Sequence, residues 1–270
     1  MSRIAFIGAG NMARSLILGL LDRGHDPARI TAADPSDEAR GLLATRGVLV
    51  TGDNAKAVNT ADAIVLATKP QVLAAVLRNL PRLDPHQLLL SIAAGAPMQA
   101  LEAIVGPTQP IVRCMPNTPA LVGEGAAALY ANAAVTPLQR QLAESLLKPT
   151  SRVTWVDDEA LIDSVIAVSG SGPAYFFAMI EAMTDTGEAL GLDRAQAQTL
   201  AAQTALGAAK MALADGADPA ALRRAVTSEG GTTQAALNVL TEAGFAATVE
   251  AAMRAAAERA RTMAEEFQSK

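Results

Sequence analysis

The sequence has one cysteine, Cys114, two histidines and only 3% aromatic residues among its 270 positions. A single cysteine excludes an intramolecular disulfide, and the absence of a cysteine and histidine cluster argues against a metal site. The net charge of −5 comes without a block of like charges, so no surface for nucleic acid is predicted. We therefore expect a small-molecule ligand, without metal or nucleic acid.

Long uninterrupted apolar runs are also missing. The longest uncharged stretches, Gln87–Leu101 and Ser164–Ile180, contain glycine, proline, serine or glutamine and fall short of the ~20 apolar residues that a bilayer span needs. The first predicted strand begins near residue 3, so we expect no signal peptide. Together with the single cysteine, these patterns predict a cytoplasmic protein that does not cross a membrane.

Apolar runs alternate with helical patterns through the first half, which predicts a mostly parallel, doubly wound α/β sheet of the Rossmann type. The expected strands are Ile4–Ile7, Ile30–Ala33, Val48–Val50, Ala63–Ala67, Leu88–Ile92 and Ile111–Met115. Two further strand-like runs, Ala126–Tyr130 and Val153–Val156, flank a helix predicted for Pro137–Leu147.

After Asp157 the pattern changes to alanine-rich helical segments, with predicted breaks at Gly170–Pro173, Gly191, Asp215–Pro219 and Gly230–Gly231. We place the boundary near residue 160. Residues 1–160 are expected to form a dinucleotide-binding domain, and residues 161–270 an all-helical domain packed against it.

The clearest motif is a G-x-G-x-x-A pattern from Gly8 to Ala13, between the first strand and an amphipathic helix predicted for Ser15–Leu21. Gly8 permits the tight turn, Gly10 lets the backbone approach a pyrophosphate, and Ala13 lets helix and strand pack closely. Because strand, turn and helix stand in this order, the motif favours a dinucleotide site over a merely structural turn.

Asp34 ends the second predicted strand, where an acidic residue contacts the adenosine ribose in Rossmann domains. The run Asp34-Pro35-Ser36 equally fits a turn with a cap for the next helix. The alternatives differ in consequence, since a carboxylate there repels a 2′-phosphate and favours NAD, whereas Arg14 or Arg40 could accept NADP.

Three loops follow predicted strands and are expected at one crevice, because ligands bind at the carboxyl ends of strands in open α/β sheets. Lys69, in the first loop, is either a catalytic acid or a partner for loop carbonyls. The helical half has two glycine-rich breaks before helices, which offer N–H groups and hydroxyls to an anion such as a carboxylate; capping is the simpler alternative. The three loops are 67–70, 91–95 and 115–119, and the two breaks are 168–175 and 227–233.

The chain resembles the pyrroline-5-carboxylate reductase family over essentially its whole length, through FIGAGNMA, ATKPQ, SIAAG, VRCMPNTPALVGEG, AVSGSGPAYFF and TSEGGTT. The resemblance implies a Rossmann domain followed by an all-helical dimerisation domain, in a homodimer with a larger homo-oligomer such as a decamer as a further option. It also implies reduction of 1-pyrroline-5-carboxylate to L-proline, the last step of proline biosynthesis, with a nicotinamide cofactor that is usually NADPH.

The resemblance also implies site residues. Those expected to bind substrate are Ser228, Gly230, Gly231, Thr232 and Thr233, and those expected to line the cofactor are Ile7, Gly8, Ala9, Gly10, Asn11, Met12, Asn54, Ala67, Thr68, Lys69, Pro70, Ala93 and Ala94. Thr233 is our choice for the hydroxyl that contacts the ring nitrogen, and Tyr175 is either a proton relay or a packing residue.

The chain departs from the family pattern at two positions. Glu229 stands where proline is common, which brings a negative charge near a substrate carboxylate. Asp34 stands where some NADPH-using relatives carry a small hydroxyl residue, so NADH is a second candidate cofactor.

Two rival functions fit part of the pattern. A 3-hydroxy acid dehydrogenase of the 6-phosphogluconate type would carry a lysine where Phe176 stands. A non-catalytic nucleotide sensor would have no reason to keep the anion loop at Ser228 to Thr233.

Overall fold

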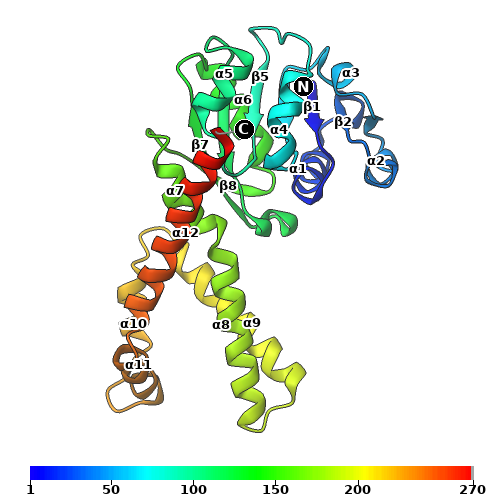
Figure 1. The fold of residues 1–270 in the computed structure, drawn as a ribbon. Coiled ribbons are helices and arrows are strands. Elements are labelled where there is room, and N and C mark those ends of the chain that lie inside the picture. Colours follow the sequence, from blue (N-terminus) through cyan, green and yellow to red (C-terminus); the bar gives the residue numbers. More distant parts are fainter. Residues whose placement is uncertain (269–270) are drawn as a thin grey trace. The chain divides into compact units, whose positions relative to one another are not determined.

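The computed structural model describes residues 1–268, and Figure 1 shows the helices and strands in chain order. The chain divides into two compact units. The first contains Met1–Ser171 together with the segment from Ala256 onward, and the second is Gly172–Ala255. These bounds differ from the predicted boundary at residue 160, because the helical segment Leu161–Val165 contacts the strand Gly125–Ala131 and Phe267 packs against the core of the sheet.

The first unit is built on one eight-stranded sheet with the order β3-β2-β1-β4-β5-β6-β7-β8. All neighbouring strands are parallel except β6 and β7, which confirms the predicted doubly wound architecture. The strands are β1 Ile4–Ile7, β2 Ile30–Ala33, β3 Leu49–Thr51, β4 Ala63–Leu66, β5 Leu88–Ser91, β6 Ile111–Met115, β7 Gly125–Ala131 and β8 Ser151–Trp155. Each bound lies within two residues of the prediction.

Alternate side chains of the strands enter two cores, one on each face of the sheet. Phe6 packs with Leu16 of α1 on one face, while Ile7 packs with Leu73 of α4 on the other. The helices of this unit are α1 Asn11–Asp22, α2 Asp37–Ala44, α3 Asn54–Val58, α4 Pro70–Arg78, α5 Met98–Val105, α6 Pro137–Leu147 and α7 Leu161–Val165. Short helical turns lie at η1 Pro27–Arg29, η2 Thr118–Val122 and η3 Ile166–Gly170.

Local sequence explains where these helices begin. Thr136 and Gln139 form a capping box ahead of α6, whose bounds match the prediction. Helix α1 starts at Asn11, four residues before the predicted Ser15, because Gly10 itself is its N-cap.

The second unit contains no strand. It consists of α8 Gly172–Ala189, α9 Arg194–Ala212, α10 Pro219–Ala225, α11 Thr232–Glu242 and the first part of α12, Phe245–Gln268, whose last turns belong to the first unit.

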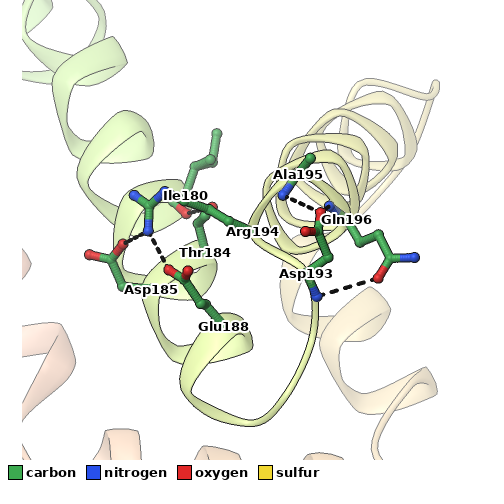
Figure 2. A network of polar contacts seen from close by, with 8 residues as sticks. All are labelled: Ile180, Thr184, Asp185, Glu188, Asp193, Arg194, Ala195 and Gln196. Atoms are coloured by element: carbon green, nitrogen blue, oxygen red, sulfur yellow. Dashed lines mark hydrogen bonds and ion pairs between the residues drawn. The ribbon is translucent and has the colours of Figure 1, made fainter.

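Helices α8 and α9 lie side by side as a hairpin (Figure 1). They approach closely where Gly187 faces Ala197, since a Cβ on Gly187 would lie 2.9 Å from the Ala197 Cβ. Figure 2 shows the turn between them, where Arg194 bridges Asp185 and Glu188 at 3.0 and 2.6 Å. These ion pairs are exposed and therefore weak, so the small residues rather than the charges set the helix spacing.

The predicted break at Gly170–Pro173 has the form of a modified turn: η3 ends at Gly170, Ser171 is a bend and α8 begins at Gly172. A π turn, η3, carries the chain from α7 into α8, with the Ser171 N–H donating to the Ile166 carbonyl at 2.8 Å. Pro173 has no N–H to offer the Ser169 carbonyl, which accepts instead from Asn117 Nδ2 at 3.0 Å. The interruption is therefore short, and α8 continues the helical run directly after it.

Because of that turn, Leu161–Ala189 forms a 29-residue helical run, and its most apolar 18-residue window has a mean hydropathy of 1.3. By length and composition alone it could span a membrane, contrary to the expectation that every apolar run is too short. Only 11% of its most apolar window is buried in the single chain. This run is thus an exposed apolar surface that requires an explanation.

Candidate functional site

The glycine turn after β1 has the geometry that a dinucleotide needs. Gly8 has φ +103°, and a Cβ there would lie 2.6 Å from the Ala67 carbonyl oxygen, so the position admits only glycine. Gly10 is the N-cap of α1 and makes no side-chain capping bond. A Cβ on Gly10 would meet no atom within 4 Å. The first N–H groups of α1 therefore face open space, which suits a phosphate.

Ile7 and Ala13, on either side of the turn, are buried, and they fix strand and helix against each other. Asn11 and Met12 open α1. Asn11 accepts a hydrogen bond from the Arg14 guanidinium, which commits the nearest cation of this helix to a local contact.

The Asp34 carboxylate joins β2 to the glycine turn. Its Oδ2 accepts from the Ala9 N–H and its Oδ1 from the Ser36 N–H, both at 2.8 Å. The cap of α2 is Ser36, whose Oγ accepts from the Ala39 N–H at 3.2 Å. Asp34 is therefore a turn residue, as one alternative had it. A carboxylate has about four acceptor positions, so two remain for the hydroxyls of a ribose.

Arg40, the second cation considered for a 2′-phosphate, is turned inward. Its guanidinium donates to the Asp34 carbonyl and pairs with the Asp37 carboxylate, and its side chain is only 19% exposed. Arg40 would have to give up both contacts to reach a phosphate.

The loops after β4 and β5 lie at the same edge of the sheet as the glycine turn. Ala67 donates its N–H to the Ile7 carbonyl at 2.8 Å, and the Thr68 Oγ1 is buried without a hydrogen-bond partner in residues 1–268. Ala93 and Ala94 lead into Gly95, which has φ +77°. A buried hydroxyl without a partner fits a ligand with a polar group.

The other expected cofactor residues lie at helix starts. Asn54 is the first residue of α3, whose N-cap is Asp53, and Pro70 opens α4. Lys69 is the exposed N-cap of α4, and its ammonium makes no hydrogen bond or ion pair in the described part of the chain. It therefore makes no hydrogen bond to loop carbonyls within the described residues, and a catalytic role for Lys69 stays a prediction.

The third loop, Met115–Pro119, has a structural role that the sequence pattern did not reveal. Asn117 accepts from the Ala126 N–H at 2.8 Å and donates to the Ser169 carbonyl, and it is only 8% exposed. This amide fastens β7 and the π turn to the end of β6.

The Ser228–Thr233 loop lies in the second unit and opens α11. Gly230 has φ +67°, and its N–H donates to Gln234 Oε1 at 2.7 Å. Gly231 is the N-cap of α11 without a side-chain capping bond, and a Cβ there would collide with the Ser228 Oγ. Thr232 and Thr233 follow with hydroxyls that make no hydrogen bond within residues 1–268. Helix capping therefore does not account for these hydroxyls.

Glu229 is exposed in the same loop. The Tyr175 hydroxyl, at the start of α8, is buried without a hydrogen-bond partner in the described chain. A packing tyrosine would have this hydroxyl hydrogen-bonded, which is not so within residues 1–268.

The remaining titratable groups offer little chemistry. Burial raises the pKa of the Cys114 thiol far above its usual range. His86 is exposed, whereas His25 is half-buried and contacts the Ser2 carbonyl through Nε2 at 3.1 Å. Burial lowers the pKa of His25. Within residues 1–268, no group of three or more His, Cys, Asp or Glu side chains could hold a metal ion.

The ion pair between Arg113 and Glu159 was not predicted from the sequence. Glu159 Oε1 accepts from the Met98 N–H at 2.6 Å and from the Arg113 guanidinium. The sequence did contain a sign of this pair, namely a charged residue inside the apolar strand Ile111–Met115. A buried arginine needs an acidic or polar partner, so a partner elsewhere in the chain could have been expected.

Two family models match the chain. One, described as "Pyrroline-5-carboxylate reductase dimerisation", covers residues 159–263, and the other, described as "NADP oxidoreductase coenzyme F420-dependent", covers residues 3–95. The first model matches the predicted helical region, and the second matches part of the predicted sheet region.

Curated relatives cover nearly the whole chain. The pyrroline-5-carboxylate reductase of Pseudomonas aeruginosa is 54% identical over 267 residues, with 98% of each chain covered. That of Haemophilus influenzae is 43% identical over 262 residues, covering 96% of this chain and 97% of the relative.

Solved structures agree with these relatives. A pyrroline-5-carboxylate reductase from Coxiella burnetii has a TM-score of 0.92 at 40% identity, and the Plasmodium falciparum enzyme with NADP bound has a TM-score of 0.88 at 29% identity. Each comparison covers 97% of this chain and 98% of the other. The chain therefore belongs to the pyrroline-5-carboxylate reductase family.

Proposed function

We propose that this protein is a pyrroline-5-carboxylate reductase, which reduces the C=N bond of 1-pyrroline-5-carboxylate to give L-proline in the last step of proline biosynthesis. The observation that carries the proposal is the Ser228–Thr233 loop. It presents the N-terminus of α11 without a side-chain cap, together with two threonine hydroxyls that make no hydrogen bond in the described chain. A substrate carboxylate and ring nitrogen match these groups.

The chemistry asks little of the protein. A bound nicotinamide supplies the hydride, which forms a C–H bond at the imine carbon while the π pair of the C=N bond moves onto nitrogen. The carbon of a protonated imine already accepts hydride, so orientation supplies most of the rate acceleration. In this proposal the Thr233 hydroxyl contacts the ring nitrogen, and Ser228, Gly230, Gly231 and Thr232 hold the carboxylate.

The first unit supplies the cofactor residues of the proposal. The pyrophosphate lies on the N-terminus of α1 at Gly8 to Met12, and Ala93 and Ala94 form the floor for the nicotinamide. Asp34 and Asn54 lie toward the adenosine, and Ile7 with Ala67, Thr68, Lys69 and Pro70 lines the middle. NADP(H) is the family's usual cofactor, and Asp34 makes NADH a second candidate.

The second unit supplies the dimer interface and the substrate loop. Residues 161–270 form a dimerisation and substrate-binding domain in this proposal, and residues 1–160 the cofactor domain. A second copy, rather than a membrane, covers the apolar run Leu161–Ala189, with a decamer as a further level of assembly. Each active site combines the cofactor loops of one copy with the Ser228–Thr233 loop of the other, in the cytoplasm.

The direct test is oxidation of NADPH and of NADH, in parallel, with 1-pyrroline-5-carboxylate and purified protein. We expect cofactor oxidation that depends on the imine and yields L-proline in equal amount. Cofactor binding without turnover would contradict the proposal and favour the nucleotide sensor.

A further inference from the structure

The loop from β5 to α5, Ile92–Pro97, is held at both ends. At its start, the Ile92 N–H donates to the Leu66 carbonyl of β4 at 3.1 Å. At its end, the Met98 N–H donates to Glu159 Oε1 at 2.6 Å, across 61 positions of sequence. Ala93 and Ala96 between them are 8% and 0% exposed. The loop is therefore a fixed part of the sheet edge.

Glu159 provides the side-chain acceptor for the start of α5, which no residue of the loop provides. The N-cap of α5 is Pro97, which provides no side-chain acceptor. A carboxylate at the first N–H groups of a helix satisfies a free donor and opposes the positive end of the helix dipole. Glu159 supplies that carboxylate from the segment that follows β8.

Arg113 fixes Glu159 in turn. Its guanidinium donates to the same Oε1 atom, and the two side chains are 10% and 27% exposed. Arg113 belongs to β6, where it lies opposite Ser91 at the end of β5. The pair thus links the start of α5 to the strand beside the loop.

The last turns of α12 close the other side of the loop. A Cβ on Gly95 would lie 3.3 Å from the Met263 Cβ and 3.6 Å from its Cε. Met263 therefore packs against Gly95 and leaves little room for a side chain there. Nearby, Arg261 Nε lies 3.9 Å from Asp163 Oδ2.

We infer that Glu159, held by Arg113, is a positioning residue for hydride transfer, because it fixes the Ala93–Ala94 floor of the nicotinamide. The inference rests on the proposed function. A displacement of about 1 Å at the reacting atoms lowers a rate by about a hundredfold. The pyrophosphate lies at Gly8–Gly10 in the proposed function, and no hydrogen bond within residues 1–268 joins these residues to the loop. Cofactor affinity should therefore respond far less than the rate.

The test compares Glu159→Ala and Glu159→Gln in the full-length protein. Single-turnover hydride transfer, with NADPH and with NADPH deuterated at the transferred position, gives the rate of the chemical step. We expect the Ala variant to lose about tenfold to a hundredfold in this rate, with the NADPH Kd within about threefold of wild type. Glutamine keeps an oxygen acceptor for Met98 and Arg113, so its rate should stay within about threefold.

Glu144→Ala is the matched control. Glu144 is also 27% exposed and accepts from Trp155 Nε1 at 2.8 Å, but it lies on α6. Its hydride-transfer rate should equal that of wild type. Met263→Ala provides a second route to the loop if Glu159→Ala does not fold, with an expected loss of about threefold to tenfold.

An unchanged rate in the folded loop variants, or a Kd that rises as much as the rate falls, would overturn the inference alone. A wild-type protein inactive on 1-pyrroline-5-carboxylate would overturn the proposed function, and the inference with it.

Discussion

The two units of the chain bury very different amounts of apolar surface. In the first, the strands β1, β4 and β5 are buried along their whole length between two cores. In Gly172–Ala255, the buried apolar side chains are Ala197 and Ala201. Large apolar side chains are instead exposed there, namely Phe176, Phe177, Met179, Met183, Leu190, Leu192, Leu200, Leu206, Met211, Leu213, Val226, Val239, Leu240, Phe245 and Val249.

A single chain thus buries the apolar core of the first unit, but it leaves the apolar side chains of the second unit exposed. The first unit satisfies its own core and arranges the glycine turn and strand-end loops without help. The second unit exposes more large apolar surface than a monomer usually carries, and its helices need a partner to bury it.

The glycine turn gives the largest expected effect. In Gly8→Ala, the φ of +103° alone costs about 1–3 kcal/mol, and the methyl group meets the Ala67 carbonyl. We expect a loss of about 2 kcal/mol or more in unfolding free energy, together with loss of cofactor binding. Denaturant unfolding and NADPH titration measure the two effects.

Gly10→Ala is the control for that experiment. Its φ is −69° and its Cβ would meet no atom, so stability should stay near wild type. The cofactor Kd should still rise about tenfold or more, because the methyl group occupies the pyrophosphate space. Equal destabilisation by both variants would show that the turn is not shaped for a ligand.

The exposed face of α8 gives the next effect. Phe177 is 63% exposed in the single chain, and Phe177→Asp should weaken the dimer by about 3 kcal/mol, roughly a hundredfold in Kd. Leu42 is 50% exposed on α2 of the first unit, and Leu42→Asp should leave the dimer intact. Analytical ultracentrifugation distinguishes them. Equal sensitivity to both would remove the contrast between the units.

Cofactor choice gives a smaller effect inside the first unit. Asp34→Ser removes a carboxylate beside the expected 2′ position, so the ratio of kcat/KM for NADPH over NADH should rise about tenfold, or 1.4 kcal/mol. Asp34→Asn should raise it too while keeping one acceptor for Ala9 or Ser36. A ratio unchanged in both variants would leave Asp34 with its turn role alone.

The pH response is the smallest effect and belongs to the first unit, which contains both histidines. Burial lowers the pKa of His25 below 6.5, so the folded state favours the neutral ring. The stability from this preference is fully present above pH 6.5 and is lost as the pH falls through the lowered pKa. Thermal unfolding between pH 7.5 and 5.5 should show a smaller decline in His25→Gln. The exposed His86, replaced by Gln, should leave the decline unchanged.

The sequence predicted what local pattern controls. The strands of the first unit follow from short apolar runs between helices, and Gly8 and Gly10 from their place between strand and helix. The bonds of Asp34 to Ala9 and of Glu159 to Met98 span 25 and 61 positions, so no local pattern contains them.

The form of the break at Gly170–Pro173 also depends on a distant residue. Whether proline ends a helix depends on what its freed carbonyl meets, and here the distant Asn117 satisfies it. The roles of Ser228–Thr233 stay predictions. The N–H groups and hydroxyls of this loop suit an anion in general, and they do not by themselves specify which anion binds.

The central prediction is that each active site combines the cofactor loops in the first unit of one copy with the Ser228–Thr233 loop in the second unit of another copy. Mixing Gly10→Asp, which blocks the pyrophosphate, with Thr233→Ala after dissociation and reassociation tests it most directly. Half of the randomly formed dimers are mixed, and each would have one intact site, so activity should return to about a quarter of wild type. Mixtures that stay at the mean of the two parents would show that each chain builds its own site, and would contradict the claim.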